Sequence, residues 1–473
     1  MLAEIIYNLP EIALLIGILH IGFLYMFGDD KAKSYAAVTR FWLLISVFLE
    51  ILFYNKNSYG DFIKKDAYSL LFILWSDICI YIMLIFSPGW FSGLKRIGGR
   101  YNILLLLAAG CLNIMIKAND LTLLLVGGCA LLIINDALIR INYEKASTEP
   151  AKRYLVISCS IFALAFVCFV YLWYMAQGQT EYVSLANVIS EQNKSLTIFM
   201  GIMGILMPLF YALSIVPFHM MAEEKTSKSI LPVAQYFATI MPIACWGVFI
   251  RINQIFIPTY GTEMAFAYKI LALISVIFGA IGASARINLH RIFTYTTMYH
   301  FGVVLLLFSL FTQEAEFTAF IYLFVYMIAL DSTYMIFYSI KSHGEYLSSV
   351  TSLSGLAKSR PYTSGALLVG LFSMIGLPPL AGFLGQLNVV YELIRNEQYI
   401  SLGFILVFML LLAKAFLNII KTIYFDQKIK LFDTENKYVL LYTWFGGIAI
   451  LVLMFNPYHI IETMKDMFYV LFL

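Results

Sequence analysis

The chain consists largely of apolar stretches about as long as a bilayer is thick, separated by short polar segments. A helix needs about 20 mostly apolar residues to cross the hydrocarbon core. Hydrophobic residues make up 61% of the 473 residues and charged residues 12%, which excludes an ordinary soluble protein. The sequence therefore predicts an all-α membrane protein with about fourteen transmembrane helices. The predicted spans are 9–27, 37–54, 67–88, 101–118, 121–141, 153–175, 197–217, 231–251, 265–285, 291–312, 316–341, 363–393, 400–425 and 438–456.

Basic residues predict how these spans are oriented. Most of the 31 lysines and arginines lie in alternate loops, such as Lys95, Arg96 and Arg100 between the third and fourth spans. Loops of this kind face the cytoplasmic side in membrane proteins, which places both termini on the outer side. The formal net charge of +3 gives no reason to expect a nucleic-acid partner.

The termini and the cysteines carry few other signals. The start, MLAEIIYNLPEIALLIG, has acidic residues where a signal peptide would carry lysines, so it is expected to be a retained first span. The tail from His459 to Leu473 is short and charged, and is expected to lie in the interface. The six cysteines occur singly, without the paired spacing of a metal site, so no metal and no cofactor are expected in this chain.

Proline and glycine interrupt the seventh and twelfth spans. The residues are Pro208 and Pro217 in the seventh span, and Gly376, Pro378 and Pro379 in the twelfth. A proline within hydrocarbon is tolerated where neighbouring helices or a polar cavity satisfy the freed backbone groups. Two interrupted helices at corresponding places in two halves are typical of transporters built from repeats. We therefore expect two inverted five-helix units with broken helices 7 and 12.

This arrangement predicts four segments along the chain. They are an N-terminal group of helices (1–118) that runs into the first five-helix unit (101–251), a second unit (265–425), and a C-terminal helix with an interfacial tail (438–473). The sequence contains no long linker or low-complexity tract that would separate a soluble domain.

Several motifs resemble those of the antiporter-like membrane subunits of respiratory complex I, and among these the subunit N group. The motifs are Leu9-Pro10-Glu11-Ile12, Val216-Pro217-Phe218-His219, Asn288-Leu289-His290-Arg291, His300-Phe301-Gly302, Gly376-Leu377-Pro378-Pro379 and Gly382-Phe383-Leu384-Gly385. The resemblance implies a proton-translocating module in the membrane arm of an NADH:quinone oxidoreductase, within a bacterial plasma membrane or a mitochondrial inner membrane. It implies other membrane-arm subunits and lipid as partners. Flavin, iron–sulfur clusters and NADH would be bound by other subunits.

The departures from this family concern its charged residues. Members carry a glutamate in the fifth helix, lysines in the seventh and eighth, and a lysine or glutamate just after the twelfth-helix break. Matching the motifs position by position places Cys129, Ala212, Pro242 and Gln386 there. A proton path needs groups whose protonation can change at neutral pH, and these residues do not supply them, apart from the weak acid of a cysteine thiol. The resemblance thus implies the fold of a proton pump with a degraded path.

Other ionisable residues remain inside the predicted spans. Asp77, Asp331 and Lys414 lie near the middle of spans three, eleven and thirteen. Because intramembrane charge is costly, each is a candidate for function. If Asp331 and Lys414 face each other, they form a buried ion pair, which is either a substitute relay or a structural contact between helices.

Three further residues have a functional and a structural reading. Asp136 precedes Arg140 by four residues, which favours a local salt bridge over a role in a path. His219 and His300 can pass protons along water chains as neutral imidazoles, or can serve as ordinary hydrogen-bonding side chains.

The sequence therefore leaves three hypotheses. The first is a complex I subunit that has kept its place in the membrane arm but has lost most or all of its own pumping. The second is an active module that uses non-standard residues such as Asp331, Lys414 and His219. The third, a stand-alone cation/proton antiporter, is weakened by the missing carboxylates and lysines, since sodium also needs oxygen ligands in the membrane.

Overall fold

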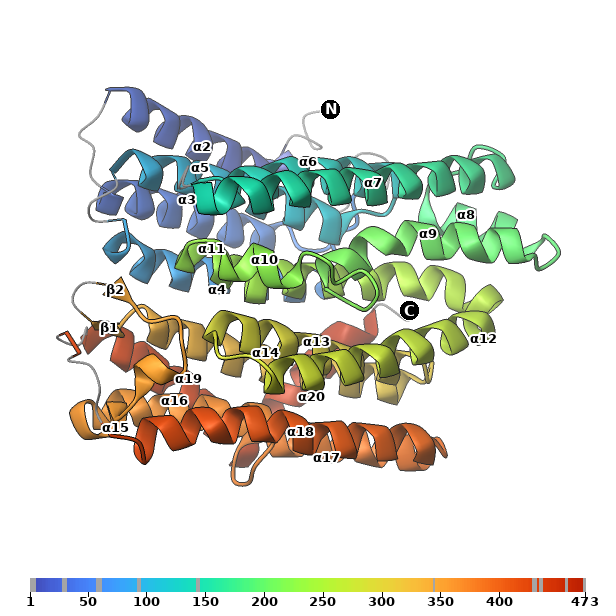
Figure 1. Ribbon diagram of the computed structural model, residues 1–473. Coiled ribbons are helices and arrows are strands. Elements are labelled where there is room, and N and C mark those ends of the chain that lie inside the picture. The colour runs from blue at the N-terminus through green and yellow to red at the C-terminus, as the bar shows by residue number, and fades with distance from the viewer. Residues whose placement is uncertain are drawn as a thin grey trace. The chain divides into compact units, whose positions relative to one another are not determined.

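The described part of the chain is helical and divides into two compact units. The computed structural model describes residues 6–27, 32–56, 62–91, 95–141, 145–342, 345–427, 432–433, 437–455 and 458–470. Unit 1 comprises Met1–Leu213, Lys228–Glu263 and Met464–Leu473, and unit 2 comprises Ser214–Ser227 and Met264–Thr463. The helices of each unit run roughly parallel, as expected for a bundle of membrane spans (Figure 1).

Unit 1 holds the helices of the first half of the chain. These are α2 (Leu9–Phe27), α3 (Ala32–Leu52), α4 (Ala67–Phe86), η1 (Ser87–Gly89), α5 (Lys95–Lys117), α6 (Leu121–Ile139), α7 (Lys145–Met175), α8 (Tyr182–Ser190), α9 (Leu196–Ala212), α11 (Leu231–Gln235) and the π-helix η2 (Tyr236–Ile240). Helix α2 packs on α3 and α5, α6 packs between α5 and α7, and α7 packs on α9. The N-terminal helices thus continue directly into the rest of this unit.

Unit 2 is built around one buried helix. Its elements are α10 (Ala222–Ser227), α13 (Leu289–Phe308), α14 (Gln313–Phe337), the hairpin strands β1 (Lys341–Ser342) and β2 (Glu345–Tyr346), η3 (Thr351–Leu353), α15 (Leu356–Ser359), α16 (Pro361–Ile375), α17 (Ala381–Arg395), α18 (Tyr399–Tyr424) and α19 (Lys437–Phe455). Helix α14 contacts α13, α16, α17 and α19. A helix covered on all sides is expected to be apolar all round, as α14 is.

Two helices belong to both units by sequence. Helix α12 (Met241–Ser284) and helix α20 (Tyr458–Tyr469) each begin in one unit and end in the other. The backbone of α12 is non-helical at Tyr260, just after Pro258, which accounts for a kink there. Helix α20 coincides with the tail that the sequence placed in the interface; its position relative to a membrane stays a prediction.

The predicted count of fourteen spans is not confirmed by helix length. Among the described residues, eleven helices are long and apolar enough to cross a membrane. One of these, Leu231–Ser284, has 54 residues and would be about 80 Å long, more than twice the hydrocarbon thickness. Its kink lies between the two predicted spans 231–251 and 265–285. The seventh and twelfth spans correspond to the shorter apolar helices Leu196–Ala212 and Pro361–Ile375.

The two predicted helix breaks are present. Helix α9 ends at Ala212 and the next helix begins at Ala222, while α16 ends at Ile375 and α17 begins at Ala381. Both intervening segments contain a cis X-Pro bond, Val216–Pro217 and Pro378–Pro379. Pro208 is a correction, because α9 continues through it and ends four residues later. A proline in a membrane helix is tolerated where neighbouring groups satisfy the freed carbonyl.

Gly376 closes the first half of the second break. Its φ of 82° is in the left-handed region, and its amide donates to the Phe372 carbonyl. A β-carbon at this position would also lie 2.1 Å from the Gln386 side chain. Glycine is therefore required here by both backbone conformation and space.

Polar N-caps set where several site-bearing helices begin. Asp66 accepts a hydrogen bond from the Ser69 amide and forms a capping box at the start of α4. Asp120 caps α6 in the same way, and Asn288 caps α13. Each cap satisfies amide groups that the first turn leaves free. The caps fix the register of the helices that carry Asp77, Asn135 and His300.

The predicted segment boundaries at 1–118, 101–251, 265–425 and 438–473 are not tested by these two units and remain predictions. Residues 1–5 and 471–473, at the ends of the first and last segments, lie outside the described part of the chain.

Candidate functional site

A network of neutral polar groups lies in the interior of unit 1. The amide of Asn135 on α6 donates to the Tyr154 hydroxyl over 3.2 Å and accepts from the Tyr236 hydroxyl over 3.1 Å. On α7 and α9, the Ser158 hydroxyl donates to the Tyr211 hydroxyl over 3.0 Å. All five side chains are buried. Their hydrogen bonds stabilise the helix packing, but hydroxyl and amide groups do not change charge at neutral pH.

In unit 1 the residues that motif matching assigns to the family's charged positions are Cys129, Ala212 and Pro242. Ala212 is buried at the end of α9, and Pro242 is buried directly after the π-helix. Cys129 is exposed on α6. A π-helix within an α-helix is common at functional sites. Here it positions Tyr236 toward Asn135, so the distortion serves a neutral hydrogen bond.

In unit 2 the corresponding region is built around His300. Its Nδ1 lies 2.6 Å from the Tyr322 hydroxyl, and its ring stacks on Tyr326 at a centroid distance of 4.0 Å. The Tyr326 hydroxyl in turn lies 2.7 Å from the Thr297 hydroxyl. His300 is buried, and its Nε2 has no hydrogen-bond partner among the described residues. The imidazole therefore sits among tyrosines, with one nitrogen free for water.

A cavity adjoins this group. It has a volume of about 180 Å³ and is lined mostly by apolar side chains, together with Tyr299, Tyr322 and Gln386. A smaller pocket is lined by His300, Tyr322, Gln386 and Ser373, whose hydroxyl also lacks a partner within the described residues. Buried polar groups of this kind commonly bind water. The region can hold water next to neutral groups.

Gln386 spans the break between α16 and α17. Its side-chain nitrogen donates to the Ile375 carbonyl over 2.9 Å. This carbonyl is at the end of α16, where helix geometry leaves carbonyls without an intrahelical partner. The neutral amide of Gln386 thus satisfies a backbone carbonyl at the helix break.

Asp331 and Lys414 do not form the ion pair that the sequence suggested. Asp331 is buried on α14 and its carboxylate lies 3.5 Å from the Tyr442 hydroxyl of α19. Lys414 is exposed on α18.

Asp136 and His219 each contact nearby residues and are not joined to another candidate residue by the contacts below. The Asp136 carboxylate accepts two hydrogen bonds from Arg140, over 2.8 and 2.9 Å, which confirms the predicted salt bridge within α6. The ring of His219 lies 5.7 Å from that of Phe278. Burial lowers the pKa of His219 and outweighs the opposing effect of a hydrogen bond with the Pro217 backbone. His219 is therefore neutral at pH 7.

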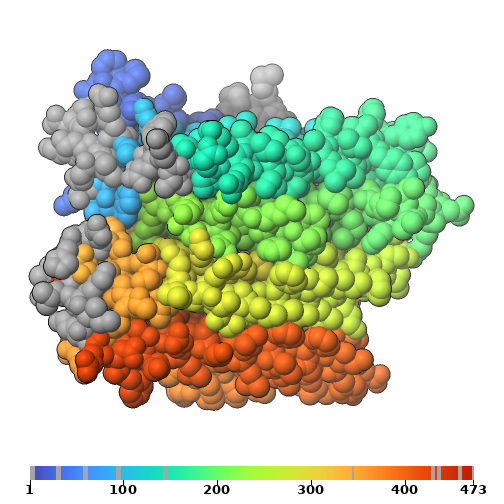
Figure 2. Space-filling model, in the orientation of Figure 1, coloured from blue at the N-terminus to red at the C-terminus, as the bar shows by residue number. Residues whose placement is uncertain are grey.

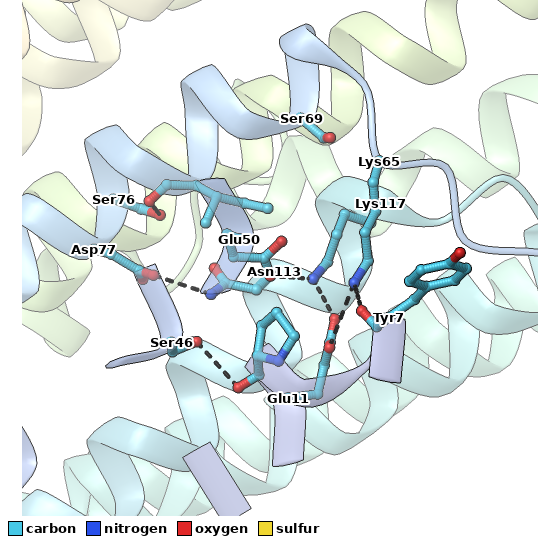
Figure 3. A network of polar contacts seen from close by, with 12 residues as sticks. Tyr7, Glu11, Ser46, Glu50, Lys65, Ser69, Ser76, Asp77, Asn113 and Lys117 are labelled. Carbon is cyan, nitrogen blue, oxygen red and sulfur yellow. Dashed lines mark hydrogen bonds and ion pairs between the residues drawn. The ribbon is translucent and has the colours of Figure 1, made fainter. Parts of the chain in front are cut away.

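A group of buried charges lies in the N-terminal helices (Figure 3). Lys117, the last residue of α5, contacts the carboxylates of Glu11 on α2 and Glu50 on α3. Lys65, just before α4, lies 3.8 Å from the second oxygen of Glu11 and donates to the Tyr7 carbonyl. Lys117 is 0% exposed and Glu50 is 4% exposed. We call Glu11, Glu50, Lys65 and Lys117 the N-terminal ion cluster.

The N-terminal ion cluster is balanced in charge. It holds two carboxylates and two ammonium groups, and each lysine faces Glu11 in Figure 3. Burial and the nearby Lys117 lower the pKa of Lys65, against the opposing effect of Glu11 and Glu50. Buried charges that pair in this way link helices and are costly to separate.

Asp77 lies beyond this cluster along the same helices. The Asn113 side-chain nitrogen donates to the Asp77 carboxylate over 3.1 Å, and Asn113 precedes Lys117 by one turn on α5. One oxygen of Asp77 and the carbonyl oxygen of Asn113 have no hydrogen-bond partner among the described residues. A line of polar groups thus runs from Asp77 in the middle of α4 to Lys117 at the end of α5.

Of the residues in this line, the sequence had singled out Asp77 alone. Glu11 entered the prediction only as part of the motif Leu9-Pro10-Glu11-Ile12, and Glu50 and Lys117 were not among the candidate residues. A usable signal was present, because in the predicted topology the first span begins, and the second and fourth spans end, on the same side of the membrane. Charges at three such ends can meet in one layer.

Within the described ranges, no group of three or more histidine, cysteine, aspartate or glutamate residues is arranged to hold a metal ion.

The sequence was compared with known families, curated proteins and solved structures. Residues 118–413 match the family described as NADH:quinone oxidoreductase/Mrp antiporter, transmembrane. The chain belongs to this antiporter family. Its similarity to "NADH-quinone oxidoreductase subunit N" of Pelagibacter ubique is 28% identity over 438 residues, covering 91% of this chain and 92% of the relative.

Two solved structures confirm the antiporter fold. One chain of respiratory complex I from Thermus thermophilus has a TM-score of 0.79 at 21% identity, covering 96% of this chain and 98% of that one. One chain of the Mrp complex from Dietzia sp. has a TM-score of 0.84 at 14% identity, covering 98% and 97%. The N-terminal ion cluster lies before residue 118, outside the part of the chain that defines the antiporter family.

Proposed function

We propose that this chain is a membrane-arm subunit of a proton-translocating NADH:quinone oxidoreductase, in the place that subunit N holds in its relatives. The name of the Pelagibacter ubique relative, whose similarity extends over almost the whole chain, supports this assignment. Electron transfer would take place in other subunits, and this chain would hold no redox cofactor. Its partners would be other membrane-arm subunits and lipid. Basic loops favour both termini on the outer side of an energy-transducing membrane.

We further propose that the central path of this subunit does not carry protons. The observation that carries this proposal is the neutral Asn135 network at the centre of unit 1, together with an amide at Gln386. A relay needs groups that gain and lose a proton near neutral pH, such as a buried lysine next to a glutamate. Hydroxyl groups and amides can orient water but cannot hold the transferred charge.

The test is the number of protons translocated per NADH oxidised by the intact complex in sealed vesicles. A subunit without its own path gives a lower ratio than a complex whose antiporter-like subunits all keep their charged residues. The proposal predicts this lower ratio together with normal NADH oxidation. A ratio equal to that of the fully charged complex would contradict it.

A second candidate function is supported by the line from Asp77 to Lys117. Here the subunit would be an active module that moves protons through its N-terminal helices, using Asp77, Asn113 and the N-terminal ion cluster. The orphan oxygens of Asp77 and Asn113 favour bound water on this line. The balanced pairing of the lysines opposes it, because a tightly paired charge is held in one protonation state.

Replacing Asp77 by Asn separates these two functions. An asparagine keeps the size and hydrogen bonding of the side chain but cannot accept a proton. Unchanged proton stoichiometry at normal assembly supports the structural role, and a lower stoichiometry at unchanged NADH oxidation supports the active module.

A further inference from the structure

Lys414 is a charged residue on the outside of a membrane helix. Helix α18 (Tyr399–Tyr424) is one of the most apolar helices of the chain, and a small part of it is buried. Lys414 lies fifteen residues after the start of this helix and ten before its end, so it is about 15 Å from the nearer end. Its side chain is exposed. On the visible face of unit 2, α18 forms a continuous strip of surface (Figure 2).

Exposed residues recur around Lys414 at the spacing of one helix face. Val407, Leu410, Lys414, Asn418 and Lys421 follow one another at intervals of three, four, four and three residues, and all are exposed. Residues with this spacing lie in one row along a helix. We call these five residues the α18 strip.

The α18 strip is unsuited to lipid. Lys421, three residues from the helix end, can reach the membrane surface with its ammonium group. Lys414 is too far from either end to do so with a four-carbon side chain, and Asn418 adds an amide one turn away. Intramembrane lysines are generally paired with an acidic group or face water. The strip therefore needs a partner that neutralises Lys414.

No acidic side chain within the described spans supplies this partner. The acidic residues in the middle of described spans are Asp77 and Asp331, and both are buried, at 1% and 4% exposure. A second copy of the chain would present the same buried carboxylates. The neutralising group must come from a different protein.

We propose that the α18 strip docks a transmembrane helix of another subunit, which carries an aspartate or glutamate at the depth of Lys414. Leu410 and Val407 pack against apolar side chains of that helix, and Asn418 offers an amide to its polar groups. The ion pair forms within the bilayer, where charge pairing fixes which helix can dock and in what register. The proposal requires an integral membrane partner but does not depend on which complex contains the chain.

The direct test is zero-length crosslinking in native membranes. A membrane-permeant carbodiimide activates the buried carboxyl group, and the Lys414 amine displaces the activating group to form an amide bond. Mass spectrometry of the digested complex is expected to identify Lys414 joined to an aspartate or glutamate in a transmembrane helix of another subunit. A Lys414 that remains unmodified, or that is joined to this chain alone, while surface lysines are crosslinked would overturn the proposal.

Matched variants measure the contribution of the pair. Lys414→Met leaves the partner carboxylate without its cation and is expected to weaken retention of the partner subunit by about thirtyfold. Lys421→Met, on the same strip but near the helix end, is expected to change retention by less than about threefold. Equal effects of the two variants would contradict the proposal, and Lys414→Arg is expected to restore retention.

The outcome is separable from the proposed function. If the crosslinked subunit does not belong to an NADH:quinone oxidoreductase, the proposed function fails while the docking site stands. If the complex is an NADH:quinone oxidoreductase and Lys414 has no carboxylate partner, the docking site alone fails.

Discussion

The ammonium group of Lys117 contacts the carboxylate of Glu50, and both side chains are buried. Through Glu11 the same lysine also contacts α2, so one residue at the end of α5 links three helices. Helices α2 and α3 are otherwise little buried. The N-terminal ion cluster thus links these two helices to α5 by buried charge pairs, in addition to their packing.

Lys117→Met is expected to destabilise unit 1 strongly. The substitution keeps an apolar side chain of similar length but leaves Glu11 and Glu50 without their shared cation. Removing one partner of a buried ion pair typically costs about 3–5 kcal/mol. Thermal unfolding of the purified protein, followed by the accessibility of its buried cysteines Cys79 and Cys245, measures this loss.

A matched pair on the surface provides the control. Lys152 lies 2.9 Å from Glu149, and both side chains are more than half exposed. Lys152→Met is expected to change stability little. Adding Glu50→Gln to Lys117→Met should recover part of the lost stability, because it removes one unpaired charge. No recovery, or equal effects of the Lys117 and Lys152 variants, would count against this role of the cluster.

Asp66→Asn is expected to remove the part of the protein's folding stability that is lost in acid when Asp66 becomes protonated. Asp66 lies 2.7 Å from Arg251, and this guanidinium holds the pKa of Asp66 below its ordinary value of 3.8, against the effect of burial. A carboxyl whose pKa is lower in the folded state contributes stability above its unfolded pKa and loses it as the pH falls through the folded pKa. Asparagine keeps the helix cap but not the charge.

The measurement is the unfolding temperature of the wild type and the Asp66→Asn variant, from neutral pH to below pH 3.8. The variant is expected to be less stable at neutral pH by about 3–5 kcal/mol, since Arg251 then lacks its partner. The two proteins should converge in acid. Parallel curves over the whole range would refute this account of Asp66.

Gly382→Ala is expected to disturb the break between α16 and α17. A β-carbon at Gly382 would lie 1.8 Å from the Ser373 carbonyl oxygen, which is backbone and cannot rotate away. Overpacking of this kind costs about 1–3 kcal/mol or more. Gly22→Ala is the control, since a β-carbon there meets nothing within 4 Å. A thermal unfolding assay that finds both variants equally stable would exclude close packing as the reason for glycine at 382.

Asn135→Leu is expected to lower stability without changing proton stoichiometry. Leucine has the same branching, with bulkier methyl groups, and leaves the buried Tyr154 and Tyr236 hydroxyls without their amide partner. An unsatisfied buried polar group costs about 1–3 kcal/mol. Thermal unfolding measures the first effect and proton translocation by the assembled complex measures the second. A loss of translocation in assembled complexes would give Asn135 a part in a working path.

The fold was largely predictable because hydrocarbon imposes strict rules on length and polarity. Both helix breaks followed from residue type: Pro217 and Pro378 lack the backbone N–H that a helix needs, and Gly376 readily adopts the left-handed conformation that ends a helix. The position of the first break was less predictable. Pro208 has the same chemistry as Pro217 but lies inside a continuous helix. Whether a proline bends or ends a membrane helix depends on the groups around it, which the sequence does not reveal.

Features of the site that depend on residue type could be predicted from the sequence. Features that depend on which side of a helix is buried could not. That Ala212, Pro242 and Gln386 occupy charged positions of the family follows from their motifs and stays a prediction. The sequence left open whether Asp331 and Lys414 face each other, and this depended on the packing of α14 and α18, which places Asp331 inside and Lys414 on an exposed face. Lys117 contacts residues more than sixty positions away in the sequence. A hydropathy pattern does not indicate which distant residues lie close together.

The central claim is that this subunit contributes no proton path of its own. It is tested most directly by replacing two of its remaining buried titratable groups together, Asp77 by Asn and His300 by Phe, in the intact complex. Protons translocated per NADH oxidised are then measured in sealed vesicles against the wild type. The account predicts the same ratio in both complexes, and a lower ratio in the variant at unchanged NADH oxidation would contradict it.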